Sequence, residues 1–104
     1  FNYQNYQNNM DFESRIKLLN RGSGITDNAY RIIIQSCIEV QDSNKYPMSQ
    51  ECINRIKSKL NGEWLVFIAN ESDENYDFYI SSIVNDNNLV FSYGKNEFQI
   101  CQIH

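Results

Sequence analysis

Few residues in this sequence have the side chains and spacing that acid–base, nucleophilic or metal chemistry needs. The single histidine is His104, the last residue of the sequence, so no histidine-based catalytic triad or metal set can be assembled. The three cysteines, Cys37, Cys52 and Cys101, lie among apolar neighbours and form no CxxC motif. That context predicts buried, reduced thiols and a cytoplasmic location, where disulfides are rare. We therefore expect no enzymatic activity, no metal and no cofactor.

One acidic segment imitates the start of a calcium-binding loop. Asp73, Asn75 and Asp77 have the alternating spacing with which an EF-hand loop begins. Such a loop then requires glycine at its sixth position and a bidentate glutamate at its twelfth, but this sequence has Phe78 and Val84 there. The segment is therefore better interpreted as a solvated acidic hairpin.

Composition excludes several further classes of protein. With 104 residues, 41% of them hydrophobic, the chain is expected to form one domain with a modest core. Its formal net charge of −4, from 9 basic and 13 acidic residues, argues against binding to nucleic acid or to anionic membrane surfaces. No apolar run approaches the length of a transmembrane helix, so no membrane insertion is expected.

The N-terminal tract differs in composition from the rest of the chain. Residues 1–13 are dominated by asparagine, glutamine and aromatic side chains, which predicts a flexible linker or arm, and residues 14–104 are predicted to form the folded domain. A sequence that begins with Phe1 instead of methionine indicates a fragment or a processed product of a longer protein.

Two amphipathic helices are predicted before a series of strands. A stripe of apolar residues at helical spacing follows Thr26, a good N-cap, and ends near Ser43. A second stripe starts at Met48 and is stopped by Gly62, with lysines in its last turn. Segment 64–68 then has the composition of a buried core strand.

The remaining strands complete an α+β fold. Alternation of apolar and polar residues slightly favours a strand within 14–21, and strands are predicted at 76–83, 89–93 and 98–103, with Phe98, Ile100 and Ile103 as candidates for burial. The expected order is β-α-α-β-β-β-β, two helices packed on an antiparallel sheet.

The strand predicted at Tyr76–Ile83 has bulky residues on both of its faces. A small domain with two helices cannot readily cover both faces of such a strand. It is therefore either a central strand or an exposed edge that pairs with another chain.

This order of elements resembles the dynein light-chain family, and the resemblance covers residues 14–104. The matching positions are Tyr46, Glu51, Ile56 and Lys57 in an ungapped stretch, then Trp64, Phe91 and Gly94. The resemblance implies a homodimer that exchanges the strand at Tyr76–Ser82, with Tyr79, Ile80, Ser81 and Ser82 in the dimer interface. It also implies a non-enzymatic interaction domain that binds short extended peptides of partner proteins by β-strand addition. The implied peptide groove consists of Ser49, Gln50, Glu51, Tyr76, Asp77, Phe78, Tyr79, Ile80 and Ser81.

Two alternatives stay open. The tract before residue 14 and the divergent groove are similar to the C-terminal light-chain-like domain of flatworm tegumental-allergen-like calcium-binding proteins. That resemblance implies a dimerisation or regulatory domain associated with tegument or cytoskeleton, preceded in the full-length protein by an N-terminal EF-hand domain. The other alternative is a profilin-like α/β sandwich that binds a small apolar ligand.

Overall fold

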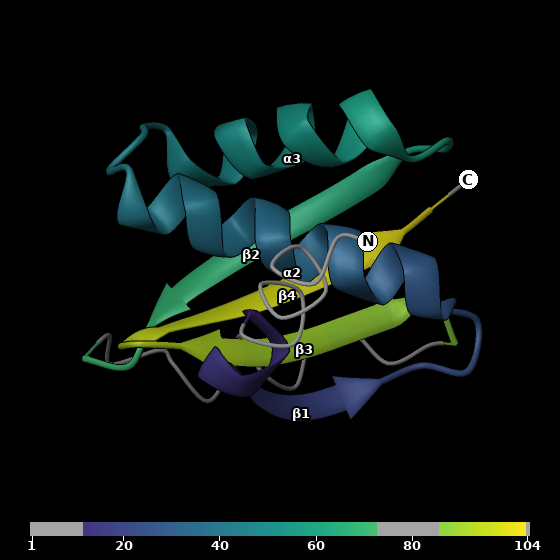
Figure 1. The fold of residues 1–104 in the computed structure, drawn as a ribbon, viewed down its shortest axis with the longest axis horizontal. Helices are drawn as coiled ribbons and strands as arrows, with labels where there is room; N and C mark the ends of the chain where they lie inside the picture. The colour runs from purple at the N-terminus through teal and green to yellow at the C-terminus, as the bar shows by residue number, and fades with distance from the viewer. Residues whose placement is uncertain (1–11, 73–85, 104) are drawn as a thin grey trace, which may run out of the picture.

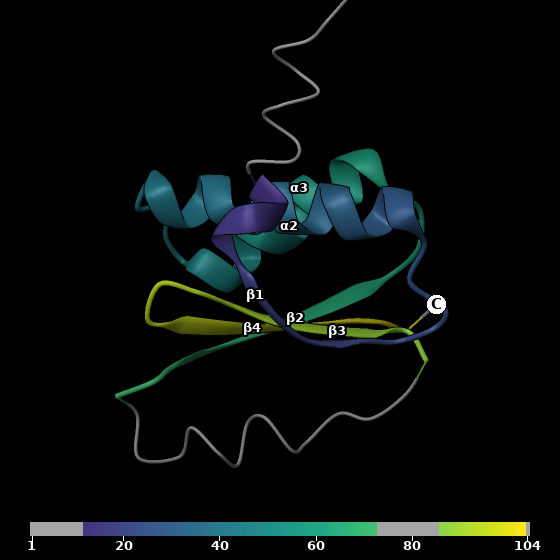
Figure 2. The same ribbon diagram turned by 60° about the horizontal axis from the view of Figure 1, so that its bottom comes forward.

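A computed structural model describes residues 12–72 and 86–103 and gives them an α+β architecture (Figure 1). A helical turn at residues 12–15 precedes β1 (Lys17–Arg21), α2 (Asp27–Asp42), α3 (Met48–Lys59), β2 (Trp64–Asn70), β3 (Asn88–Tyr93) and β4 (Asn96–Gln102). The described strands form one antiparallel sheet in the order β1-β3-β4-β2, and both long helices lie on one face of it (Figure 2). This confirms the predicted fold class, while the strand predicted at 76–83 lies outside the described residues.

Both helices begin and end where the sequence predicts. The Thr26 hydroxyl oxygen accepts a hydrogen bond from the backbone N–H of Ala29 at 3.1 Å and so caps α2. Helix α2 ends at Asp42, followed by Ser43 as the C-cap. Helix α3 starts at Met48 with no side-chain cap, and its last turn carries two lysines next to the negative end of the helix dipole.

The core lies between the two helices and the sheet. Phe91 of β3 and Phe98 of β4 are fully buried, and their rings stack with centroids 5.2 Å apart. Cys37 of α2 and Cys52 of α3 are buried in the same core, and Cys101 is also buried. All three are free thiols, as the sequence predicts. Burial raises the pKa of Cys37 well above its usual value, and a hydrogen bond from the Cys37 thiol lowers the pKa of Cys52.

Arg21 stabilises the turn between β1 and α2 through hydrogen bonds and a cation–π contact. Its guanidinium donates two hydrogen bonds to the carbonyl oxygen of Ile25, at 2.9 and 3.2 Å, and one to the carboxylate of Asp27 at 2.7 Å. The same guanidinium lies 4.6 Å from the ring centroid of Tyr30. The hydrogen bond and charge of Arg21 lower the pKa of the Asp27 carboxyl.

Two expectations about burial need correction. The composition of segment 64–68 predicts a buried core strand, and Trp64 and Val66 are indeed part of the core. Within the described sheet, however, β2 is an edge strand, and Leu65 and Phe67 on its other face are 39% and 42% exposed. Ile103, a candidate for burial, is 47% exposed because it lies beyond Gln102, the last residue of β4. None of the described helices is long and apolar enough to cross a membrane.

Candidate functional site

The backbone of β2 has one side without a partner among the described residues. Two hydrogen bonds just beyond the ends of the β2–β4 pair show which residues face each other as bonded pairs. The N–H of Ile103 donates to the carbonyl of Glu63, and the N–H of Glu71 donates to the carbonyl of Lys95. In an antiparallel pair, hydrogen-bonded residues alternate with residues whose N–H and C=O point the other way. From the register of β2 with β4, Leu65, Phe67 and Ala69 therefore bond to β4. The backbone groups that point to the free edge belong to Trp64, Val66, Ile68 and Asn70.

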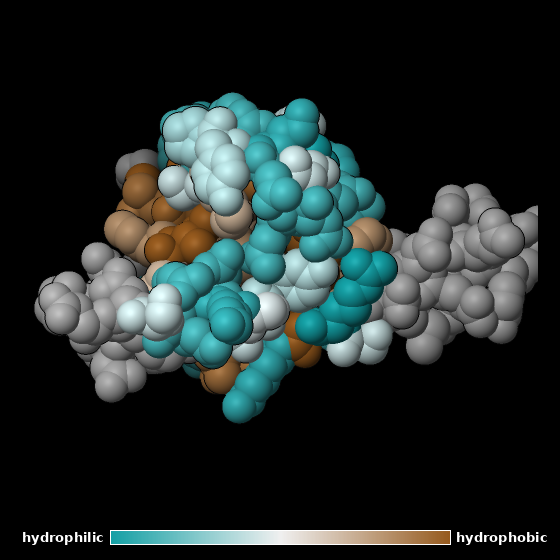
Figure 3. Space-filling view, turned by 90° about the vertical axis from the view of Figure 1, so that its left-hand side faces the viewer, coloured by the Kyte–Doolittle hydropathy of each residue, from teal (hydrophilic) through white to brown (hydrophobic). Residues whose placement is uncertain are grey.

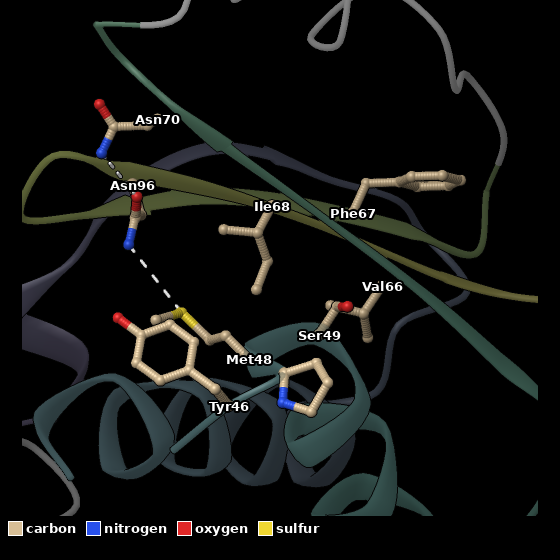
Figure 4. A pocket seen from close by; sticks show the side chains of 9 residues that line it. Tyr46, Met48, Ser49, Val66, Phe67, Ile68, Asn70 and Asn96 are labelled. Atoms are coloured by element: carbon tan, nitrogen blue, oxygen red, sulfur yellow. Dashed lines mark hydrogen bonds between the residues drawn. The ribbon is translucent and has the colours of Figure 1, made fainter. Parts of the chain in front are cut away.

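A cleft of about 670 Å³ lies along this free edge, between β2 and the start of α3. Its lining consists of Tyr46, Pro47, Met48, Ser49, Val66, Phe67, Ile68, Asn70 and Asn96. In the close view, the side chain of Ile68 points towards Met48 and Tyr46, whereas that of Phe67 points away from them (Figure 4). None of the nine lining side chains carries a charge. The cleft is therefore an apolar trough with a few neutral polar groups on its margin.

One end of the cleft is closed by hydrogen-bonded carboxamides. The Asn70 amide donates to the side-chain oxygen of Asn96 at 3.1 Å, and the Asn96 amide donates to the side-chain oxygen of Gln41 at 3.0 Å. The Asn96 amide also lies 4.0 Å from the sulfur of Met48 (Figure 4). This network joins the end of β2, the start of β4, the end of α2 and the start of α3, so it fixes the width of the cleft at that end.

Apolar surface gathers on the side of the molecule where β2 ends and where α2 connects to α3. In Figure 3 its largest area (brown) has hydrophilic residues above and below it. Tyr46 is 72% exposed at the cleft, and Leu65 and Phe67 are exposed on the face of β2 that points away from the helices. An extended chain placed beside β2 would thus meet apolar side chains on both faces of the strand.

Of the predicted groove residues that the structure describes, only Ser49 lines the cleft. Ser49, in the first turn of α3, lines the cleft. Gln50 is exposed and donates a hydrogen bond to Asn54 at 2.9 Å, one helical turn further on. Glu51 is half-buried and is not part of the lining. The other predicted groove and interface residues, Tyr76, Asp77, Phe78, Tyr79, Ile80, Ser81 and Ser82, lie outside the described residues.

Sequence reasoning missed most of the cleft. The sequence predicts a helix and its entry turn for the segment that contains Tyr46 and Met48, and their apolar character does not indicate that they line a cleft beside β2. Asn70 and Asn96 are 26 positions apart and meet only because β2 pairs with β4 in this register. No local signal in the sequence reveals that pairing.

The arrangement suits binding and offers little for catalysis. The cleft contains no acid, base or thiol, and the three cysteines are buried elsewhere. Across residues 12–72 and 86–103, no group of three or more histidine, cysteine, aspartate or glutamate side chains is placed to hold a metal ion. What the site presents is a row of backbone donors and acceptors beside an uncharged trough, which is the chemistry that recognises an extended polypeptide.

No protein-family model matches this chain, and no curated protein matches it either.

Proposed function

We propose that this chain is a non-enzymatic protein–protein interaction domain of dynein light-chain type, which forms a homodimer and binds extended partner peptides by β-strand addition. The observation that carries the proposal is the edge of β2 that has no partner strand within residues 12–72 and 86–103. Four of its residues direct backbone N–H and C=O groups away from β4, along an uncharged cleft next to the start of α3.

A strand edge with exposed apolar side chains and no charged residue favours pairing with another strand. Unpaired strand edges with exposed apolar side chains invite another strand, and natural proteins usually protect them with charged residues or proline. β2 contains neither a charged residue nor a proline. Two of its side chains, Leu65 and Phe67, are about 40% exposed. A strand from a second copy would pair its backbone with Val66 and Ile68 and cover this apolar surface.

In the proposed dimer, residues 76–82 of one copy provide the strand that pairs with β2 of the other copy. This segment follows β2 directly in the sequence and combines four aromatic or β-branched residues within seven positions, a composition that favours strands. A partner peptide would then add to the outer edge of that strand, with Ser49 at the start of α3 close to its side chains.

Analytical ultracentrifugation at micromolar concentration tests the proposal. The unmodified chain is expected to sediment as a dimer, and Tyr46→Lys is expected to weaken the dimer because it puts a charge into an uncharged cleft. Tyr46 is 72% exposed, so this substitution leaves the core intact. Leu19→Lys is the matched control, because Leu19 is an exposed residue of β1, the opposite edge of the described sheet.

A strict monomer, or a dimer that responds equally to both lysine variants, would overturn the proposed use of the β2 edge. Screening the confirmed dimer against an array of extended peptides then tests the peptide-binding part. A dimer that captures no peptide would favour a pure dimerisation module over a peptide-binding hub.

A further inference from the structure

We propose that the chain's own N-terminal tract, residues 1–10, occupies the β2 edge and its cleft in the same molecule and competes there with strands from other chains. This inference rests on the proposed function, because it assigns a regulator to the same edge. Three observations support it: the place where the tract joins the fold, its length, and its lack of charge.

The tract joins the fold next to the carboxamide end of the cleft. The helical turn at residues 12–15 is held there by Arg15, which lies 5.1 Å from the ring centroid of Phe12 and 3.7 Å from the carboxylate of Asp42. That carboxylate also accepts a hydrogen bond from the Tyr93 hydroxyl at 2.7 Å. In Figure 1 the turn (purple) overlaps the end of β3.

From this position, two further bonds lead to the cleft. Gln41, the neighbour of Asp42 on α2, donates to the Tyr93 carbonyl at 3.2 Å and accepts a hydrogen bond from Asn96, which lines the cleft. The start of the described chain and the cleft are thus linked through the end of α2. A segment that leaves this point towards β2 would enter at Asn70, the last residue of the strand.

The tract is long enough to reach along the strand. Eleven residues precede Phe12, and an extended chain of that length spans up to about 36 Å. Pairing with six residues of β2 needs about 20 Å, which leaves roughly half of the tract to cover the approach. In this arrangement residue 10 would lie near Asn70, at the end of β2, and residue 1 near Trp64, at its start. The tract and β2 would therefore run in the same direction, as a parallel pair.

The chemistry of the tract matches the cleft. Residues 1–10 contain no charged side chain, although 21% of the whole chain is charged, and the cleft lining is also uncharged. In an extended conformation Phe1 and Tyr3 face one side and Tyr6 and Met10 face the other. Both faces of β2 offer apolar side chains to meet them, and the amide groups of the tract can extend the carboxamide network at the end of the cleft.

Residue-resolved amide hydrogen exchange on the full chain tests this inference. The double variant Asn5→Pro with Tyr6→Pro removes adjacent backbone donors, so it disrupts pairing in either register. The matched control, Asn5→Ala with Tyr6→Phe, keeps those donors. The measurement is made at a concentration where ultracentrifugation shows the monomer. The amides of Val66 and Ile68 are expected to exchange at least about tenfold faster in the proline variant than in the control.

The neighbouring amides of Leu65 and Phe67 provide an internal reference. They bond to β4 in either case, so their exchange is expected to stay unchanged. Equal exchange of Val66 and Ile68 in the two variants would overturn the inference. The dimer provides a second readout: if the tract competes for the edge, the proline variant is expected to dimerise more tightly than the control, and an unchanged dissociation constant contradicts the inference.

These results are separable from the test of the proposed function. If the proline variant has no effect but Tyr46→Lys still weakens the dimer, the edge is an interface and the tract is not its regulator. If Tyr46→Lys leaves the dimer unchanged, the proposed function itself fails. A synthetic peptide with the sequence of residues 1–10, added to the proline variant, is expected to restore slow exchange at Val66 and Ile68, whereas a scrambled peptide is not.

Discussion

Proline substitutions at adjacent positions of β2 test which backbone groups point to the free edge. At Leu65 the register directs the N–H to the carbonyl of Cys101 in β4, whereas at Val66 the N–H points away from β4. Proline has no N–H, so at the first position it removes a hydrogen bond to β4, and at the second it removes none to β4. The comparison is made in the Asn5→Pro, Tyr6→Pro variant at a concentration where it is monomeric, so that neither proposed partner strand bonds to Val66. Leu65→Pro is therefore expected to destabilise the domain more than Val66→Pro, although Val66 is the more buried residue.

The magnitude follows from the bond that is lost. Cys101 is 3% exposed, so its carbonyl lies in a poorly solvated part of the sheet. Removing the donor to such a buried acceptor costs about 1–3 kcal/mol. Comparison of each proline with alanine at the same position subtracts the loss of the side chain. The expected difference between the two positions is about 2 kcal/mol.

Urea unfolding of the four variants, followed by far-ultraviolet circular dichroism, measures this difference. Trp64, the only tryptophan, lies in β2 itself, so its fluorescence gives a local second probe. A difference of about 2 kcal/mol corresponds to roughly 10 °C in Tm for a domain of this size. If proline at Val66 costs as much as proline at Leu65, relative to the alanine variants, the assignment of the free edge is wrong.

Three further predictions concern the domain that supports the edge. Thr26→Ala removes the cap of α2 and is expected to cost about 1 kcal/mol in urea unfolding, and Thr26→Ser is expected to retain most of that stability. Arg21→Gln removes the charged bonds that hold the β1–α2 turn and is expected to cost about 2 kcal/mol, with acid titration of stability as a second readout. Arg21 lowers the pKa of Asp27 in the folded state, so the ionised carboxylate stabilises the fold fully above the pKa of an unfolded aspartate, near 3.9. This stabilisation is lost as the pH falls through the lower pKa that Asp27 has in the folded state. The Arg21→Gln variant is expected to lack this acid-dependent loss of stability. Cys37 and Cys52 are fully buried, so their reaction with a thiol reagent should follow unfolding, and rapid labelling of the folded chain would contradict the core that contains them.

The sequence by itself determines the helices and the chemical character of the core. Periodic apolar residues locate both helices, because one face of each has to be buried, and Thr26 marks where α2 begins. The cysteines are correctly predicted as buried thiols, because each lies directly beside an isoleucine within an apolar pattern. These features depend on contacts between residues that are close in sequence, or on the average preference of a side chain for the core.

Tertiary structure alone decides which strand lies at the edge. Segment 64–68 has the composition of a core strand, yet its neighbours in the sheet depend on β4, which is more than 25 residues away, and on the order in which β1 and β3 pair. The same pairing brings Asn96 to Asn70 and turns the backbone of Val66 and Ile68 outward. Register is a property of two strands together, so no inspection of one strand reveals it. The candidate site depends on this register. The sequence therefore predicts Ser49 as a groove residue but does not reveal that β2 lies beside it.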